Sequence, residues 1–434
     1  MAYAIAREKI SSEVASTIRK MLTIMPKTSG FNKYSQGAVI EPIVFYKLED
    51  GIVHIPYLFA ASLFQIIPND DISYPKLEWK FTGQLRDKQV EVEATSWKQL
   101  SAYGTSTLGL YPGFGKTILG AKLASRTQLL TVVLVHREPL VKQWKATFEE
   151  FTDAKVWCVG EKNPPSTCDV IVCMDTRWSL IKTELRDRVG FLIIDEAHAF
   201  CTPSHVQCLL SFHPKYILAE SATLERDDGM ESMMYAICGT HGVYREFEGN
   251  FSVIKVNTGF KPARKQNSRQ GTDWSALVNE SLFCENRNKL IVEFVKTNLS
   301  RTILILTSVV KHAELLNSML VEAGISSDFL CGSKKGYNDG KVLVGTISKI
   351  GTGFDQRTFC DNYSGNRFDL LLLVCSIKKY SVLVQNAGRV FRSENPTIIY
   401  FVDDDSIFDS HWRICKKWFV TRGGNVTECS FKLQ

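Results

Sequence analysis

Short apolar runs recur along most of the chain and alternate with amphipathic stretches. In residues 81–247 these runs are rich in β-branched residues and bounded by polar turns; they are TVVLVH, DVIVCM, FLIIDEAH and KYILAESAT. Strands that are buried on both faces of a parallel sheet have this composition, with crossover helices between them. The alternation resumes in residues 276–434 with TILILTS, KVLVGTIS, FDLLLLVCS and TIIYFVDD. The pattern therefore predicts an α/β protein with two tandem parallel-sheet domains.

The segments outside these two regions follow other patterns. Residues 1–80 predict a small N-terminal accessory domain, with an amphipathic helix over residues 10–24 and two strand-like runs, IEPIVFYKL and GIVHIPYLF. The turn signal Glu49-Asp50-Gly51 separates those two runs. Residues 248–275 contain the basic stretch KPARKQNSRQG, which we interpret either as a linker between the domains or as a solvated surface loop. The tail HWRICKKWFVTRGG predicts a C-terminal helix.

Composition bears on the compartment of the protein more than on its function. With 44% hydrophobic and 23% charged residues, the composition is that of a globular protein. No run approaches the roughly twenty apolar residues of a membrane span, and the N-terminus lacks a signal-peptide pattern, so we expect an intracellular protein of the cytoplasm or nucleus. The twelve cysteines are scattered without a C-x-x-C pair, which favours reduced thiols over zinc ligands. A net charge of +6 favours a polyanionic partner.

A glycine-rich loop after an apolar strand candidate predicts a phosphate-binding site. The loop consists of Pro112, Gly113, Phe114, Gly115, Lys116 and Thr117. Glycines let backbone amides surround phosphate oxygens, the lysine reaches the β and γ phosphates, and the threonine ligates Mg²⁺. In the strict G-x-x-x-x-G-K-T pattern the first position is glycine, and here it is Leu110. The loop predicts ATP and Mg²⁺ as ligands.

An acidic pair lies at the end of a second buried strand. Asp195 and Glu196 directly follow the run FLII and are followed by Ala197 and His198. A carboxylate at the carboxyl end of a strand beside a phosphate loop is placed to ligate Mg²⁺, and the next glutamate can polarise the attacking water. An acidic loop after a strand is common, but its position about eighty residues after Lys116 in a sheet-forming region favours the catalytic interpretation.

The run QNAGRVFR in the second half carries a further catalytic candidate set, Gln385, Arg389 and Arg392. The two arginines are three residues apart, so we expect them on one helix face and directed at the same phosphate group. A guanidinium that reaches a γ-phosphoryl group across a cleft can raise the hydrolysis rate by about 10³ to 10⁵. Arginines on a helix usually form a solvated face, but the presence of Lys116 and Asp195 favours the catalytic interpretation.

In this order, the motifs resemble those of superfamily 2 helicases over almost all of residues 80–405. The resemblance implies two RecA-like motor domains that hydrolyse ATP between them and move along DNA or RNA, and helicases tolerate the change at Leu110. The forms LVHREPLVKQWK, LIIDEAH, SATLERDDGM, CENRNKL and GTGFD most resemble the branch that contains the excision-repair and transcription-factor helicase, phage recombination helicases, and the transcript-release helicases of poxviruses and related large DNA viruses.

The resemblance also implies roles for single residues. Arg86 and Gln89 resemble the adenine-recognition motif, in which Lys88 replaces the usual aromatic residue. Further nucleotide contacts are implied for Gly353 and Asp355. The implied nucleic-acid contacts are His136, Arg137 and Thr346. The residues that would couple hydrolysis to domain movement are His198, Ser221 and Thr223.

Together these features predict an ATP-dependent helicase or translocase that acts on nucleic acid. The resemblance implies DNA with 3′ to 5′ polarity as the track, a monomer as the working form, and transcription or replication proteins as partners, in viral transcription, replication or repair. RNA is the alternative track, and a duplex translocase that displaces bound protein or polymerase without strand separation is the alternative activity. A decayed, non-enzymatic scaffold is disfavoured because every catalytic candidate is present.

Overall fold

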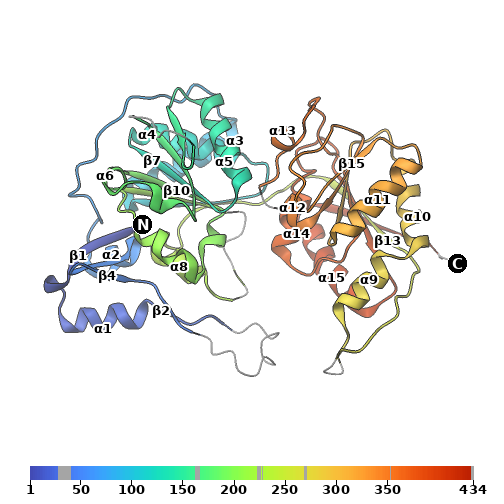
Figure 1. The fold of residues 1–434 in the computed structure, drawn as a ribbon, viewed down its shortest axis with the longest axis horizontal. Coiled ribbons are helices and arrows are strands. Elements are labelled where there is room, and N and C mark those ends of the chain that lie inside the picture. The colour runs from blue at the N-terminus through green and yellow to red at the C-terminus, as the bar shows by residue number, and fades with distance from the viewer. Residues whose placement is uncertain are drawn as a thin grey trace. The chain divides into compact units, whose positions relative to one another are not determined.

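Two parallel β-sheets form the centres of two units in the computed structural model of the chain (Figure 1). The structure describes residues 1–27, 41–161, 167–221, 226, 228–267, 271–351 and 353–431. The first unit comprises Met1–Leu110 and Phe114–Arg245, and the second comprises Tyr111–Gly113 and Glu246–Gln434. The prediction of two tandem parallel-sheet domains is confirmed.

The first unit contains a sheet of seven parallel strands in the order β12-β6-β11-β10-β7-β9-β8. The strands are β6 (Thr105–Leu110), β7 (Thr131–Val135), β8 (Val156–Cys158), β9 (Val170–Met174), β10 (Phe191–Asp195), β11 (Tyr216–Ser221) and β12 (Val243–Arg245). The helices of this part are α3 (Asp87–Tyr103), α4 (Lys116–Thr127), α5 (Glu138–Phe151), α6 (Thr183–Arg186), α7 (Val206–Leu210) and α8 (Glu231–Cys238). Every residue of β7 and β10 is buried, as the β-branched runs predicted.

The expected accessory region lies within the first unit and shares its hydrophobic core. Its elements are β1 (Ala2–Ala6), α1 (Ser12–Met21), β2 (Thr23–Ile24), β3 (Ile43–Val44), β4 (Lys47–Glu49), β5 (Ile52–Pro56) and α2 (Tyr57–Phe64). Ile18 and Tyr57 belong to the same buried cluster as Val132 of the parallel sheet. Asp50 and Gly51 form the two-residue turn between β4 and β5 with φ of 49° and 76°, as a type I′ hairpin turn requires.

The second unit contains a parallel sheet in the order β15-β16-β14-β17-β18-β13-β19. Its strands are β13 (Phe251–Asn257), β14 (Ile303–Thr307), β15 (Ser327–Leu330), β16 (Val342–Thr346), β17 (Leu370–Leu373), β18 (Thr397–Val402) and β19 (Gly424–Ser430). Its helices are α9 (Trp274–Leu282), α10 (Glu285–Lys296), α11 (Val310–Glu322), α12 (Ile347–Gly351), α13 (Gln356–Phe359), α14 (Tyr380–Ala387) and α15 (Ser406–Thr421). The four apolar runs of the second half form β14, β16, β17 and β18.

The structure differs from the sequence pattern at both ends of this second region. Within residues 248–275, expected to be a linker, Phe251–Asn257 forms β13 between β18 and β19. Phe251, Val253 and Val256 supply buried side chains from that strand, which a linker would leave in solvent. At the other end, α15 forms in the expected helical tail, and the chain then returns as β19 beside β13.

A buried ion pair ties three parts of the second unit together. Arg287 of α10 donates from Nε to the two carboxylate oxygens of Asp403 at 2.8 and 3.0 Å, and both side chains are 2% exposed. Asp403 also accepts from Thr258 Oγ1 at 2.6 Å and from Ser281 Oγ. The same arginine donates from Nη2 to Val374 O at 2.8 Å. The Arg287 side chain therefore links the start of the second half to the ends of β17 and β18.

Asp403→Ala is expected to lower the free energy of unfolding of the second unit by about 3–5 kcal/mol, because the variant leaves the Arg287 charge buried without its partner. Chemical denaturation monitored by tryptophan fluorescence would measure the change. Glu293→Ala is a suitable control, since Glu293 pairs with Lys296 at 2.6 Å while its side chain is 62% exposed. That variant should change stability by less than about 1 kcal/mol. Equal effects of the two variants would contradict a stabilising role for the buried pair.

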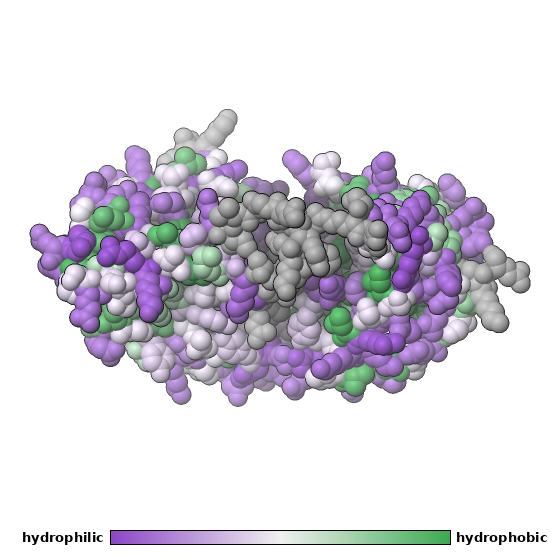
Figure 2. All heavy atoms as spheres, turned by 90° about the horizontal axis from the view of Figure 1, so that it is seen from below, coloured by the Kyte–Doolittle hydropathy of each residue, from purple (hydrophilic) through white to green (hydrophobic). Residues whose placement is uncertain are grey.

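The visible surface of the described residues is largely polar. Figure 2 shows one face of the molecule, on which hydrophobic residues occur in small separate groups among hydrophilic ones. Scattered exposed apolar side chains are ordinary on soluble domains. Among the residues that the structure describes, no helix has both the length and the apolar character that crossing a bilayer requires.

Candidate functional site

The predicted phosphate loop connects β6 to α4. Gly113 and Gly115 have φ of 91° and 101°, a left-handed conformation that is costly for any residue with a side chain. Lys116 begins α4 and donates from Nζ to Leu110 O at 3.1 Å. Leu110 itself is fully buried, so its backbone carbonyl contacts the lysine while its side chain packs in the core. The absence of the first glycine therefore leaves the lysine contact in place.

The adenine-recognition candidates contact the phosphate loop directly. Gln89 donates from Nε2 to Phe114 O at 2.9 Å, and Arg86 donates from Nη2 to the same carbonyl. Gln89 also accepts at Oε1 from the backbone N–H of Arg86 at 2.9 Å, an arrangement that begins α3. The structure thus brings together two motifs that are separated by some twenty-five residues of sequence. The replacement at Lys88 does not remove these contacts.

Asp195 lies at the carboxyl end of β10, close to the strand end that carries the phosphate loop. Its side chain accepts a hydrogen bond at Oδ2 from Trp144 Nε1 at 2.8 Å. Burial, followed by repulsion from Glu196, raises the pKa of Asp195 to about 6, although the Trp144 hydrogen bond and Lys116 oppose that rise. Glu196 adopts φ of 51°, a left-handed conformation that costs on the order of 1–3 kcal/mol for a residue with a side chain. Such strain is characteristic of catalytic positions.

The residues around Asp195 have the donor chemistry that suits Mg²⁺. Thr117 supplies a hydroxyl, which accepts from Gln143 Nε2 at 3.3 Å, and Asp195 supplies a carboxylate. Oxygen ligands are those that Mg²⁺ prefers, and Mg²⁺ usually takes only one or two protein carboxylates beside phosphate oxygens and water. In the described part of the chain no group of three or more His, Cys, Asp or Glu side chains is placed to hold a metal ion. The hydroxyl of Thr117 and the carboxylate of Asp195 fit a cation that takes its other ligands from nucleotide phosphates and water.

A hydrogen bond connects the acidic motif to the next strand end. His198 Nδ1 lies 2.9 Å from Ser221 Oγ, and the same nitrogen lies 3.4 Å from Glu196 Oε2. Burial lowers the pKa of His198, while the charge of Glu196 opposes that shift. Because the neutral ring of His198 contacts both Glu196 and Ser221, a movement of one of them would be passed to the other. Thr223, expected to share this coupling role, lies outside the described residues.

The expected nucleic-acid contacts on the first unit follow β7. His136 is partly buried, and its pKa is lowered to about 4 by burial first and by Arg137 second, against an opposing effect of Glu196. Arg137 is exposed and precedes α5, which begins at Glu138. Because all strands of the sheet are parallel, the ends of β7, β9, β10 and β11 lie along one edge. The exposed arginine therefore shares an edge with the nucleotide candidates.

The two arginines of the second unit do not lie on a helix. The expected shared helix face is wrong, because α14 ends at Ala387 and hydrogen-bonded turns follow. Val390 is fully buried, and the ring of Phe391 stacks on Phe247 with centroids 3.9 Å apart. The turns after Ala387 keep Val390 in the core, and they carry Arg389 and Arg392 on either side of it. The arginines are therefore presented by turns that the core holds in place.

These turns place both arginines against the loop that contains Gly353 and Asp355. Arg392 Nη1 lies 3.0 Å from Asp355 Oδ2. Arg389 donates from Nη1 to Phe354 O at 2.7 Å and from Nη2 to Gly351 O. Gln385 of α14 lies near the same loop, since a Cβ added to Gly351 would be 3.7 Å from Gln385 Oε1. The second unit thus gathers all its predicted catalytic and nucleotide-contact residues in one cluster.

Thr346 is placed differently from the expectation of a nucleic-acid contact through its side chain. It ends β16, is 2% exposed, and accepts at Oγ1 from Ser348 Oγ at 3.4 Å. Its neighbour across the sheet is Thr307 of β14. The Thr346 hydroxyl is thus engaged within the fold.

Comparisons with known proteins assign the chain to a family. Residues 82–226 match the family model described as "Type III restriction enzyme, res subunit". "Putative helicase 161L" of Invertebrate iridescent virus 6 is 28% identical over 92% of this chain and 95% of its own length. Transcript termination protein A18 of Myxoma virus is 24% identical over 75% of this chain and 72% of its own length. The chain belongs to the superfamily 2 helicases.

A solved structure supports the architecture of this helicase. S. cerevisiae Dbp5 bound to RNA and ADP BeF3 superposes with a TM-score of 0.55 at 14% identity, covering 78% of this chain and 89% of that one. At this identity the similarity concerns the fold, which is that of two tandem RecA-like domains. The prediction of RecA-like domains is confirmed, and the helicase is an ATP-hydrolysing enzyme.

Several residues that shape the site of the helicase were not found from the sequence. Trp144 and Gln143 lie in the run PLVKQW of α5, and their contacts with Asp195 and Thr117 depend on helix packing. Glu220 precedes Ser221 in β11 and pairs in register with Asp195. It is fully buried, and both of its carboxylate oxygens lack a hydrogen-bond partner among the described residues. An acid inside the apolar run KYILAES was the available signal.

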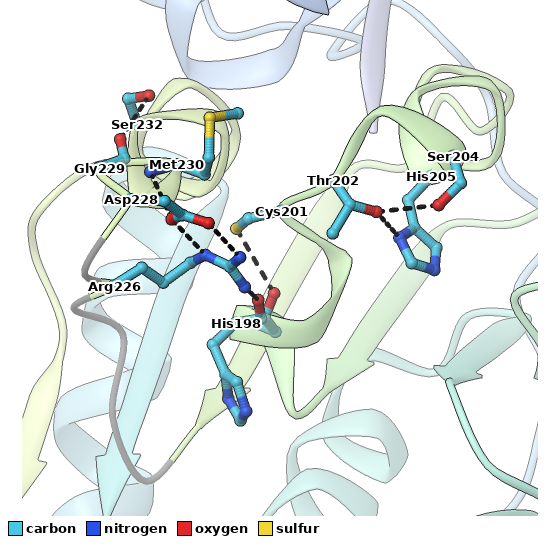
Figure 3. Close-up of polar contacts among 11 residues, drawn as sticks. His198, Cys201, Thr202, Ser204, His205, Arg226, Asp228, Gly229, Met230 and Ser232 are labelled. Atoms are coloured by element: carbon cyan, nitrogen blue, oxygen red, sulfur yellow. Dashed lines mark hydrogen bonds and ion pairs between the residues drawn. The ribbon is translucent and has the colours of Figure 1, made fainter. Parts of the chain in front are cut away.

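Arg226 is another residue of the helicase that belongs to none of the predicted site motifs. It forms a two-pronged pair with Asp228 at 2.9 and 2.6 Å and donates from Nη1 to His198 O at 2.6 Å (Figure 3). The arginine therefore fixes the backbone of the acidic motif from the segment that follows β11. The run SATLERDDGM contains both members of this pair, so its charge pattern was a usable signal.

Proposed function

We propose that this helicase is an ATP-driven motor on DNA that moves with 3′ to 5′ polarity in viral transcription, replication or repair. One observation carries the proposal. The phosphate loop, Asp195 and the His198–Ser221 hydrogen bond lie along one edge of the sheet in the first unit. Two relatives support the process and the polarity in this proposal. A18 is named a transcript termination protein. XPB2 of Sulfurisphaera tokodaii, named a DNA 3'-5' translocase, is 26% identical over 41% of this chain.

The first unit would hold ATP in a defined orientation. Backbone amides of the phosphate loop and the ammonium group of Lys116 would bind the phosphates. Thr117 and Asp195 would hold Mg²⁺, which supplies charge neutralisation at the β and γ phosphates. Glu196 would orient the attacking water and take up its proton as the γ-phosphoryl group leaves ADP. Arg86 and Gln89, already held on Phe114 O, would contact the base.

The second unit would complete the site when the two units close on ATP. Arg389 and Arg392 would exchange contacts with their own loop for contacts with the γ-phosphoryl group, and Gln385 would support them. Loss of that group after hydrolysis removes the negative charge that both arginines bind, which favours opening. His198 and Ser221, with Thr223, would pass the change at Glu196 to the end of β11.

Nucleic acid would bind along the carboxyl edges of the sheets, mainly through its phosphates. His136 and Arg137 would contact the backbone on the first unit, and the segment around Thr346 would do so on the second. Phosphate contacts carry little sequence information and weaken with salt, so binding should be insensitive to sequence and should fall as ionic strength rises. The proposed working form is a monomer.

The track is tested by measuring steady-state ATP hydrolysis with no nucleic acid and with saturating single-stranded DNA, duplex DNA or RNA. We expect single-stranded DNA to raise turnover by about 10-fold or more and RNA to raise it much less. The relative named L396 of Acanthamoeba polyphaga mimivirus, at 23% identity, is described as an RNA helicase. Stronger stimulation by RNA than by DNA would therefore overturn the DNA assignment in favour of that alternative.

Polarity and strand separation are tested on duplexes with a single-stranded tail on either the 3′ or the 5′ side, and on blunt duplexes. A 3′ to 5′ helicase displaces the strand opposite a 3′ tail and leaves the other two substrates intact. If ATP is hydrolysed on all three without displacement, the activity is translocation on duplex DNA. Displacement of a protein block from the blunt duplex would then distinguish that alternative from unproductive hydrolysis.

A further inference from the structure

A row of hydrogen bonds joins two loops at the carboxyl edge of the first sheet. His205 Nε2 lies 2.6 Å from Asp175 Oδ2, and His205 Nδ1 lies 2.6 Å from Thr202 Oγ1. Ser204 Oγ lies 2.9 Å from that same threonine hydroxyl (Figure 3). Asp175 directly follows β9, whereas Thr202 and His205 lie in the segment after the acidic motif. The hydrogen bonds thus connect a strand end on one side of β7 with one on the other.

The donor of the His205–Asp175 hydrogen bond follows from chemistry. A carboxylate only accepts, so His205 donates from Nε2 to Asp175. The other ring nitrogen accepts from the Thr202 hydroxyl in a neutral imidazole and donates to it in a protonated one, so the contact forms in both states. The side chains of His205 and Asp175 are 15% and 11% exposed. Because water competes little for these groups, the two loops are held in a fixed relation.

One end of the row is anchored to the segment proposed to bind nucleic acid. The backbone N–H of Asp175 donates to Val135 O at 2.9 Å. Val135 is the last residue of β7 and directly precedes His136 and Arg137. A phosphate backbone that pulls on Arg137 therefore acts on a strand end to which Asp175 is bonded.

The other end is anchored to the acidic motif. Thr202 donates from its backbone N–H to Phe200 O at 2.9 Å, and Phe200 ends the short 3-10 helix that follows Glu196. The ring of His205 also packs against Phe200, with centroids 5.0 Å apart. A movement of Asp175 would therefore be passed by the side chains of His205 and Thr202 to the 3-10 helix that follows Glu196.

We propose that His205 is a positioning residue that couples nucleic-acid binding to ATP hydrolysis in this helicase. The inference rests on the proposed function, because it requires turnover to respond to nucleic acid. Its role differs from that of His198, which touches Glu196 directly. A residue that acts only through bound nucleic acid should affect the stimulated rate and leave the unstimulated rate close to that of the parent.

The test compares ATP hydrolysis with and without saturating single-stranded DNA in His205→Phe and His205→Gln. The phenylalanine keeps the ring contact with Phe200 and loses both hydrogen bonds, so the stimulated rate should fall by about 5- to 20-fold. The unstimulated rate should stay within about 2-fold. The glutamine retains an N–H donor near the position of Nε2 and should restore at least half of the lost stimulation. His241→Phe is the matched control, since His241 also bonds a threonine, Thr105, but at the amino end of β6.

A double-variant comparison separates coupling from general damage. If Asp175 and His205 act through one hydrogen bond, Asp175→Ala combined with His205→Phe should be no worse than the more severe single variant. Equal loss of stimulated and unstimulated turnover, or full stimulation of His205→Phe, would overturn the coupling role while leaving the proposed function intact. A parent enzyme that no nucleic acid stimulates would overturn both. Thermal unfolding identifies any variant that fails to fold, and the glutamine variant and Asp175→Ala then decide the question.

Discussion

Lys116→Ala should reduce nucleic-acid-stimulated ATP hydrolysis by at least about 100-fold, the loss expected when one positioned charge at the reacting phosphate is removed. The Lys116 side chain donates to Leu110 O at the start of the loop that contains Gly113 and Gly115. Alanine leaves the backbone cradle intact but removes the ammonium group that would bind the β and γ phosphates. Single-turnover hydrolysis of labelled ATP would measure the loss without interference from product release.

Lys122→Ala is the control for this prediction. Lys122 lies on the same helix, α4, but its ammonium group lies over the ring of Phe81 at 5.1 Å rather than in the loop. Hydrolysis by that variant should remain within about 2-fold of the parent, because a partly exposed cation–π contact contributes only about 0.5–1 kcal/mol to stability. If Lys116→Ala retained turnover similar to that of Lys122→Ala, the phosphate-loop assignment would be wrong.

The sheets could be predicted from the sequence because their strands are buried on both faces. Runs such as TVVLVH and FDLLLLVCS contain no polar face, and only a parallel α/β sheet covers both sides of such strands. β13 and β19 lack this signal. β13 mixes buried with partly exposed and exposed residues, and β19 has only partly exposed and exposed residues. Their positions in the sheet depend on pairing with β18 and with each other, which a local pattern does not encode.

The same distinction applies to the first eighty residues. Local features such as the Asp50-Gly51 turn were predictable because positive φ at both positions favours this residue pair. The shared core was not, because the contact of Tyr57 and Ile18 with the sheet cluster is a tertiary property of apolar faces that look the same in an independent domain. The local pattern therefore indicated a separate accessory region where the structure has a continuous core.

In the candidate site, the residues predicted best are those whose chemistry requires a fixed local spacing. The phosphate loop and the acidic motif are contiguous, and backbone geometry places them at strand ends. Trp144, by contrast, reaches Asp195 from a helix fifty-one residues earlier. The arginine turns show a related limit, because the spacing of Arg389 and Arg392 suits a helix while α14 ends at Ala387. The spacing of two residues does not show where a helix ends.

The contacts of Arg392 are compatible with two roles, which predict different effects of its removal on nucleotide affinity and turnover. As observed, the side chain pairs with Asp355 at 3.0 Å and is 31% exposed. A purely structural arginine would hold the loop of Gly353 and would affect nucleotide affinity and turnover together. A residue that binds the γ-phosphoryl group most strongly in the transition state affects turnover far more than nucleotide affinity.

Arg392→Ala should therefore lower kcat for ATP hydrolysis by about 10³-fold, within the range known for such guanidinium groups. The dissociation constant for ATP should change by less than about 3-fold, since ground-state binding is provided by the first unit. Rapid-quench hydrolysis and fluorescent-nucleotide titration would measure the two quantities. Arg392→Lys tests the geometry, because lysine keeps the charge but cannot form the planar, two-pronged contact. We expect it to recover less than about one-tenth of the lost rate.

Arg413→Ala controls for the loss of an arginine–aspartate pair in the same unit. Arg413 lies 2.6 Å from Asp409 on α15, and its side chain is 79% exposed. Kinetics should be unchanged in that variant because its pair is solvated and joins two residues of α15 rather than the loop of Asp355. Parallel losses of affinity and turnover in Arg392→Ala would assign Arg392 a structural role, since a transition-state contact cannot weaken ground-state binding to the same extent. The catalytic contribution of the second unit would then have to come from Arg389, whose guanidinium donates to two backbone carbonyls of the same loop.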